Sequence, residues 1–128
     1  MDTIGNMLTS IRNGYMSQKE VVSVPYSKLK EAVAKKLAEL SFVEKVGVED
    51  VEGKKKLTAK LNYKDNKPAL THLKRVSKPG LRVYSQRKNL KPVLGGLGYT
   101  LISTPQGILT NKEAVKKGAG GELVCEVW

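Results

Sequence analysis

The sequence has few of the residues from which catalytic and metal sites are usually built. Its 128 residues include one cysteine, Cys125, and one histidine, His72, which lie in different segments. The sequence therefore offers almost no cysteine or histidine ligands for a metal site, and almost no residues for a nucleophile–base pair. We expect no enzyme activity, no cofactor and no small-molecule substrate. Cys125 lies in the strand-like run 122–128, where we expect it to be a buried apolar residue, as suits a protein of the reducing cytosol.

Long apolar runs and targeting signals are also missing. No stretch of eighteen apolar residues occurs, and the N-terminus has no signal-peptide pattern. We therefore expect a soluble, cytoplasmic protein with no membrane partner. The length and the hydrophobic content of 40% are those of one ordinary domain, or two small lobes, with a buried core.

Acidic residues are scarce in the second half of the chain. The net charge is +11; residues 1–66 hold 12 Lys/Arg and 9 Asp/Glu, whereas residues 67–128 hold 11 and 3. The stretch 74–91 has no acid and seven cations: Lys74, Arg75, Lys78, Arg82, Arg87, Lys88 and Lys91. Cations collected on one half favour a polyanionic partner, although a merely soluble basic surface is the alternative. Tyr84 within this stretch is expected either to stack on a base or ribose or to be a core aromatic.

The first half has the pattern of an α-β-α-β-β unit. Asp2 or Thr3 is placed to cap a helix whose apolar face is Ile4, Met7, Leu8, Ile11 and Tyr15. A short strand at 21–24 ends at Pro25, and a β-hairpin turns at 52–54. We expect both helices of this unit to cover one face of its sheet.

The second helix is expected to begin after the capping residue Ser27. Its predicted apolar side is Leu29, Ala32, Val33, Leu37 and Leu40, which leaves Lys28, Lys30, Lys35 and Lys36 on a solvated face. The lysines of the first turn lie at the positive end of the helix dipole, which is unfavourable for cations. A phosphate bound there would offset this repulsion. On the first helix, Arg12 and Asn13 lie off the apolar stripe, and are either solvated or a minor nucleic-acid contact.

Residues 64–68 have the composition of a linker, and the charge balance changes at the same place. We therefore predict domains at 1–66 and 67–128. The second is expected to be mostly antiparallel β, with a type II turn at 77–80, strands at 81–84, 99–103 and 122–128, and a short helix from Asn89 to Leu94. The predicted fold class is α+β with two small lobes.

A hairpin loop followed by a helix start is the most informative local pattern. Pro105 and Gly107 supply the turn between two apolar runs, and the spacing of Thr110 and Glu113 predicts a capping box on a helix that ends at Gly118. Ser103, Thr104 and Gln106 can each donate and accept hydrogen bonds, and Gly107 allows close approach. Two hydroxyls, an amide side chain and the helix N-terminus are expected to form a corner that binds RNA, with an ordinary turn as the alternative.

Two rival functions remain open on the sequence. A nuclease would need clustered carboxylates near the basic stretch, where the second half offers only Glu113, Glu122 and Glu126. The glycines at 95–98 do not form a phosphate loop, because they end a predicted helix and no Lys-Ser or Lys-Thr follows them. A DNA-binding module is distinguished by competition between duplex DNA and structured RNA.

Several motifs resemble one family along the whole chain. They are residues 2–13, Ser27-Lys28-Leu29-Lys30, residues 77–84 (Ser-Lys-Pro-Gly-Leu-Arg-Val-Tyr), Leu94-Gly95-Gly96-Leu97-Gly98, Ser103-Thr104 with Gly107, and Gly120-Gly121-Glu122. The chain resembles the bacterial-type S-eight family of small-subunit ribosomal proteins. The resemblance implies a two-lobe protein that binds the central domain of small-subunit (16S) ribosomal RNA and supports its assembly beside neighbouring ribosomal proteins. It also implies that the second lobe makes the main contacts, and that some members repress translation of their own mRNA.

Taken with the basic stretch, the resemblance gives a set of expected RNA-binding residues: Ser103, Thr104, Gln106, Gly107, Tyr84, Lys88, Arg87, Lys78, Gly121, Glu122, Lys30 and Arg12. The first helix and Lys30 are implied to contact RNA more peripherally. This sequence departs from the family pattern in the loop, where Pro105 and Gln106 replace a hydroxyl and a cation. Thr3 also stands where a proline is common, and Pro92 is displaced by one position from the usual proline.

Overall fold

The computed structural model describes residues 3–128, which divide into two compact units, 3–71 and 72–128. Asp2, one of the two predicted caps of the first helix, lies outside the described residues, as does the side chain of Thr3. No helix in the described part of the chain is long and apolar enough to cross a membrane. The architecture is α+β, as the sequence predicts.

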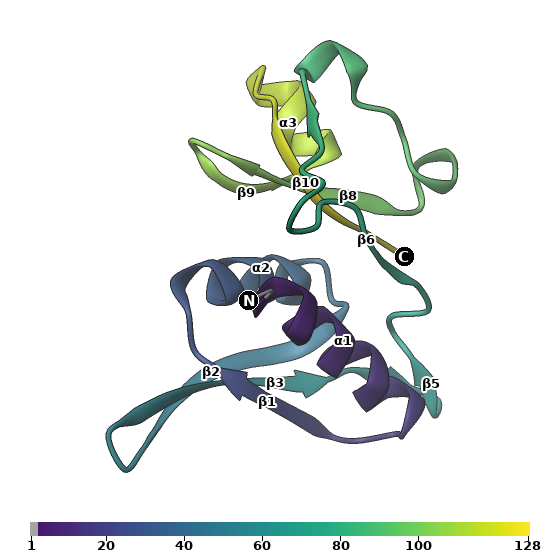
Figure 1. Cartoon of the computed structure of the whole chain (residues 1–128). Helices are drawn as coiled ribbons and strands as arrows, with labels where there is room; N and C mark the ends of the chain where they lie inside the picture. Colours follow the sequence, from purple (N-terminus) through teal and green to yellow (C-terminus); the bar gives the residue numbers. More distant parts are fainter. Residues whose placement is uncertain (1–2) are drawn as a thin grey trace. The chain divides into compact units, whose positions relative to one another are not determined.

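The first unit is a three-stranded antiparallel sheet with two helices on one face (Figure 1). Its elements are α1 (Thr3–Met16), β1 (Val21–Pro25), α2 (Lys28–Glu39), β2 (Val43–Val51) and β3 (Lys54–Leu61), and the strand order is β1-β3-β2. Met7, Leu8 and Ile11 of α1 are buried, so the predicted apolar stripe is confirmed. The hairpin at residues 52–54 and the α-β-α-β-β order are also confirmed.

The buried side of α2 differs from the predicted one. Ser27 caps the helix as predicted, because its hydroxyl accepts a hydrogen bond from the Lys30 amide. However, Leu29 is 48% exposed, whereas Lys30 and Lys36 are buried. A lysine can bury its aliphatic stem while its amine reaches a partner or the surface, and Lys36 Nζ lies 2.7 Å from a Glu39 carboxylate oxygen. Burial lowers the pKa of Lys30.

The segment predicted as a linker is ordered as a small hairpin. Strands β4 (Tyr63–Lys64) and β5 (Lys67–Pro68) pair with each other, and Asp65 and Asn66 between them have positive φ. Aspartate and asparagine tolerate this left-handed conformation better than most residues do. The polar composition therefore reflects a tight turn, and the chain passes from the first compact unit to the second between Thr71 and His72.

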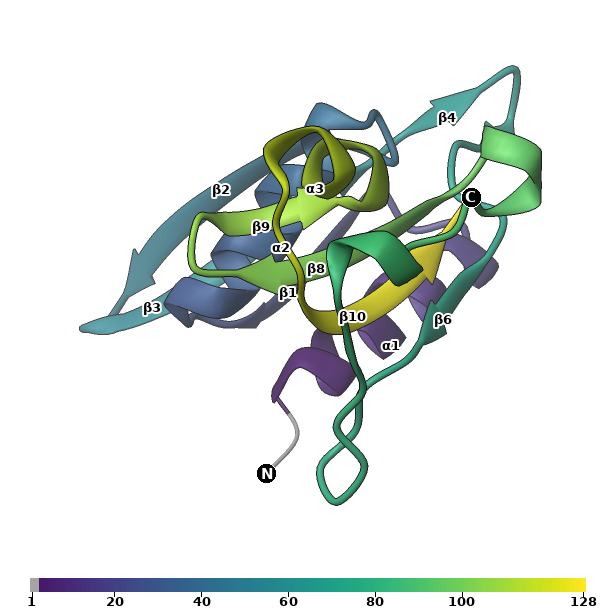
Figure 2. The same cartoon turned by 90° about the horizontal axis from the view of Figure 1, so that it is seen from above.

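The second unit is built on one antiparallel sheet, seen in Figure 2. The strand order is β6 (Leu73–Arg75), β10 (Gly121–Val127), β8 (Tyr99–Thr104) and β9 (Gly107–Thr110), and β7 (Tyr84–Ser85) pairs with the start of β10. Helix α3 (Asn111–Lys117) packs on the face that carries Ile102 and Leu109. The hairpin, the helix that follows it and the last strand are confirmed.

The stretch between the predicted turn and β8 has less regular structure than the sequence predicts. The turn is confirmed, with Gly80 at φ 84° and the Leu81 amide bonded to the Lys78 carbonyl. Of the predicted strand 81–84, only Tyr84 lies in a strand, the two-residue β7. The predicted helix from Asn89 is wrong: the chain forms two short 3₁₀ turns, η1 (Arg87–Asn89) and η2 (Leu94–Gly96). Pro92 explains the difference, because it has no amide to donate and disfavours a helical residue before it.

Cys125 is fully buried in β10, as predicted, and its environment yields a testable expectation. Burial, with a smaller contribution from Glu126, raises the pKa of this thiol to about 12. Only about one thiol in ten thousand is then ionised at a pH near 8. We expect a thiol-specific reagent to leave the native protein almost unmodified and to react fully once denaturant unfolds it. Fast, complete reaction in the absence of denaturant, followed by absorbance, would show that the buried position is wrong.

Candidate nucleic-acid interface

Three strands place Tyr84 and Ser103 on one face of the second sheet. Tyr84 of β7 is directly opposite Glu122 of β10, and Glu122 is directly opposite Ser103 of β8. Residues directly opposite each other in antiparallel strands project from the same face. Two strand spacings separate Tyr84 from Ser103, which is about 10 Å. The hairpin and the basic stretch therefore meet on a single face.

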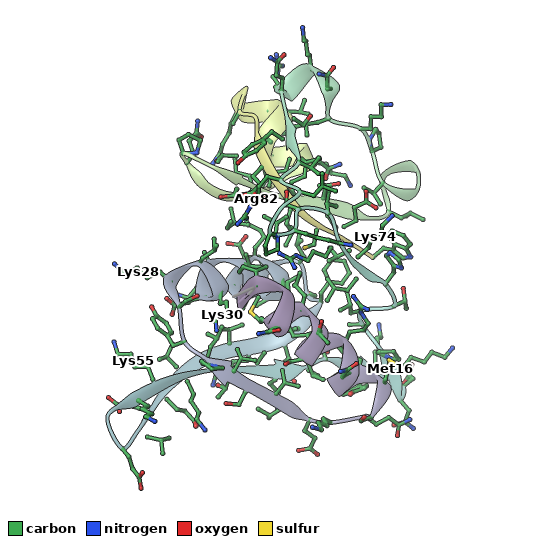
Figure 3. The ribbon with its side chains drawn as sticks, viewed as in Figure 1. Met16, Lys28, Lys30, Lys55, Lys74 and Arg82 are labelled. Atoms are coloured by element: carbon green, nitrogen blue, oxygen red, sulfur yellow. The ribbon has the colours of Figure 1, made fainter. Side chains whose placement is uncertain are left out.

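The acid in the middle of this row is paired internally. The carboxylate of Glu122 lies 3.1 Å from a guanidinium nitrogen of Arg82, a residue of the basic stretch labelled in Figure 3. Burial lowers the pKa of Arg75, and the positive charge of Arg82 lowers this pKa further. The negative charge of Glu122 raises it and so partly offsets both effects. These three groups form one charged cluster with an excess of one positive charge. Glu122 thus neutralises part of the cluster and leaves the face able to accept an anion.

Tyr84 is available for stacking. Its side chain is 68% exposed, which excludes the alternative that it is a core aromatic. The tyrosine ring offers a flat surface on which a base or a ribose can pack.

The hairpin loop is closed by its own threonine. The Thr104 hydroxyl donates to the Gly107 carbonyl at 2.8 Å and accepts from the Gln106 amide at 3.1 Å. Gly107 has φ 107°, a conformation that favours glycine, and a Cβ there would meet no atom within 4 Å. The Ser103 hydroxyl takes no part in these two bonds. Thr104 therefore shapes the loop, while Ser103, Gln106 and the open space at Gly107 remain for a ligand.

The glycine pair at the start of β10, Gly120 and Gly121, allows close backbone approach. A Cβ on Gly121 would lie 2.1 Å from the Ser103 carbonyl oxygen, and one on Gly120 would lie 2.5 Å from the Ser85 carbonyl oxygen. No side chain fits at either position. Gly121, an expected RNA-binding residue, thus has a packing role that holds β8 against β10.

A hollow of about 870 Å³ opens beside Tyr84. Arg87 anchors its wall, because Arg87 Nε donates to the Val115 carbonyl in the last turn of α3 at 2.8 Å. Lys88 is exposed at this hollow. Gln86 and Asn89 line it as well. Neither is among the expected RNA-binding residues, although both lie inside the acid-free stretch 74–91.

The side chains at the start of α3 are hydrogen-bonded within the protein. Thr110 and Glu113 form the capping box as predicted, each side chain bonded to the other's amide. Thr110 and Asn111 are buried; Asn111 accepts from the Thr100 amide and donates to the Lys91 carbonyl. The side chains of Thr110, Asn111 and Glu113 are thus engaged within the protein, and an RNA contact at this helix N-terminus stays a prediction.

The remaining expected residues and cations are divided between the two units. Lys78, at the exposed turn, and Lys74 of β6 belong to the second unit. Arg12, exposed on α1, and Lys30, buried on α2, belong to the first. Figure 3 shows Lys28 extending away from α2. The second unit thus carries every expected residue except Arg12 and Lys30, which belong to the first unit.

Two of the three carboxylates of the second unit are engaged in structural roles. Glu113 completes the capping box and Glu122 pairs with Arg82. Within residues 3–128, no group of three His, Cys, Asp or Glu side chains is placed to hold a metal ion.

Comparison with known proteins gives one consistent result. The family model described as Ribosomal protein S8 matches residues 2–128. Three relatives are named small ribosomal subunit protein uS8. The protein from Trichormus variabilis is 48% identical to this chain over 129 residues, which cover 99% of this chain and 97% of the relative. The protein from Kineococcus radiotolerans is 48% identical over 128 residues (99% and 97%), and the protein from Thioalkalivibrio sulfidiphilus is 44% identical over 126 residues (98% and 96%). The chain therefore belongs to the ribosomal protein S8 (uS8) family.

Proposed function

We propose that this chain is a structural, non-enzymatic protein of the small ribosomal subunit that binds the central domain of small-subunit rRNA directly and supports its assembly. The row Tyr84–Glu122–Ser103 carries the proposal, since it joins the hairpin loop to the basic stretch on one face. Membership of the uS8 family supports the ribosomal role.

Phosphate contacts and contacts to the RNA groove have different roles in this proposal. Exposed lysines of the basic stretch, such as Lys78 and Lys88, bind phosphates and fix the position of the RNA. Ser103, Gln106 and the backbone at Gly107 read the shape of the minor groove or of an irregular internal loop, including its 2′-hydroxyls. A-form RNA exposes these groups in a wide, shallow groove. Tyr84 stacks at the edge of the same contact.

The Ser103 hydroxyl tests the loop directly. We expect Ser103→Ala to weaken binding to a central-domain rRNA fragment by roughly five- to tenfold, since a single hydrogen bond is lost. The salt dependence should stay unchanged, because no charge is removed. Ser23→Ala, an exposed strand serine in the first unit, is the matched control. Thr104→Ala is a poor test, because it also opens the turn. Equal affinities for Ser103→Ala and Ser23→Ala in a filter-binding titration would remove the loop from the contact.

The same titration separates the rival functions. Duplex DNA should compete far less well than the rRNA fragment, and added divalent metal should produce no cleavage.

A surface that reads RNA shape also binds any transcript that presents the same shape. We therefore propose that the chain's own mRNA competes with rRNA for it, which the same assay measures.

A further inference from the structure

A second hollow, of about 400 Å³, lies between α3 and the segment before β8. Its lining includes three apolar side chains or rings and three lysines: Leu90, Pro92, Val115, Lys91, Lys112 and Lys116. Helix α3 packs on the Ile102 face of the sheet, and alternation along β8 puts Ser103 on the other face. The groove therefore lies on the opposite side of the sheet from the Ser103 side chain, and it adjoins Arg87, whose Nε donates to the Val115 carbonyl.

The walls of this groove are fixed by hydrogen bonds. Asn111 Nδ2 donates to the Lys91 carbonyl at 3.0 Å, and Lys112 Nζ donates to the Gly96 carbonyl at 2.6 Å. Both bonds tie the segment 91–96 to α3, whose two ends are held by the capping box and by Gly118. A preformed groove loses less ordering entropy on binding than a mobile one does.

The chemistry of the groove favours an acidic peptide segment. Its apolar lining favours an apolar side chain on the partner. Its three lysines, with no acid among the lining residues, favour negative charge on the partner. An RNA strand supplies the charge, but the groove contains no aromatic ring for a base to stack on. The one amide side chain, Asn111, is engaged at both of its ends, so base edges and ribose find no side-chain amide or hydroxyl there.

We propose that this groove docks a segment of a neighbouring small-subunit protein in which an aliphatic side chain lies between acidic residues. The aliphatic side chain fills the space beside Leu90, Pro92 and Val115, and the carboxylates pair with Lys91 and Lys116. The inference rests on the proposed function, since it assumes that the chain enters the small subunit. A second copy of this chain is a poor occupant, because its net charge is +11.

Lysine acetylation followed by mass spectrometry tests the proposal on the unmodified protein. We expect Lys91 and Lys116 to react freely in the protein alone and in its complex with rRNA, and to be protected about fivefold or more in assembled small subunits. Lys117, the next residue on α3, does not line the groove and should stay reactive in all three states. Lys88, the proposed phosphate contact, should be protected already by rRNA.

Other outcomes would contradict either the proposal for this groove or the proposed function. Protection of Lys91 and Lys116 by rRNA alone would make the groove an RNA contact and overturn the proposal. Full reactivity in assembled subunits, or equal protection of Lys117, would also overturn it. If rRNA left Lys88 unprotected, the proposed function itself would fail.

A zero-length carbodiimide crosslink identifies the occupant. In assembled subunits, we expect Lys116 or Lys91 to be joined to an Asp or Glu of another ribosomal protein, next to an aliphatic residue. Lys116→Glu should lower the yield of the adduct at Lys91 about fivefold, whereas Lys117→Glu should change it less than twofold. Both variants should bind the rRNA fragment within about twofold of each other. The absence of any such adduct would contradict the proposal.

Discussion

Raising the salt concentration from about 50 to 200 mM is expected to weaken binding to the rRNA fragment by about a hundredfold or more. The exposed lysines of the basic stretch that are proposed to bind phosphates, such as Lys78 and Lys88, are the reason. Binding through about five phosphates releases the counterions that had condensed on them, at a slope of roughly 0.7–0.9 in log K per phosphate. The dependence is measured by titrating the fragment at several salt concentrations. A slope near zero would mean that phosphates make no substantial contribution.

Two variants assign this slope to individual groups. Lys88→Ala should lower the slope by about one, because it removes a single phosphate contact. Tyr84→Ala should leave the slope unchanged while weakening binding by roughly 1–3 kcal/mol, the range for loss of one stacked base. If instead Tyr84→Ala changed the slope and Lys88→Ala did not, the assigned roles would be reversed.

Gly121→Ala is expected to be the most destabilising single substitution at the interface, costing about 3 kcal/mol or more in free energy of unfolding. The added Cβ would lie 2.1 Å from the Ser103 carbonyl oxygen, so β8 and β10 must separate. The row that aligns Tyr84 with Ser103 would be lost together with stability. Urea unfolding followed by circular dichroism measures the cost.

Gly47→Ala is the matched control for that experiment. Gly47 also lies in a strand, but a Cβ there would meet only the Thr58 hydroxyl, at 3.3 Å. The side chain of Thr58 can shift where a backbone carbonyl cannot, so we expect a cost of about 1 kcal/mol or less. Equal costs for the two variants would show that the close approach at Gly121 is not tight.

Local signals in the sequence predict much of the fold and part of the interface. The stripe Met7, Leu8 and Ile11, the capping box at Thr110 and the glycine turns depend on residues a few positions apart, so spacing alone reveals them. The acid-free stretch also leads to Tyr84 and Lys88. The strand pairing that places Tyr84 opposite Glu122 joins residues far apart in sequence, and no local pattern contains it.

The differences arise where distant contacts decide which side of an element is buried. On α2, hydrophobicity predicts that Leu29 is inside and Lys30 outside, whereas packing turns the helix so that the aliphatic stem of Lys30 is buried. At the start of α3, the Asn111 side chain accepts from the Thr100 amide and donates to the Lys91 carbonyl. Both partners come from other segments, so no local pattern in the sequence predicts that this side chain is engaged.

Hydroxyl-radical cleavage from iron tethered to the protein most directly tests the proposal that the second unit has a single RNA-binding face. Gln106→Cys and Gln86→Cys provide attachment sites in the loop and beside Tyr84, while buried Cys125, with a thiol pKa raised to about 12, should stay unlabelled. The account predicts that both positions cleave the same helix of the central domain of small-subunit rRNA, at neighbouring nucleotides. Cleavage in two separate helices, or none from either position, would contradict it.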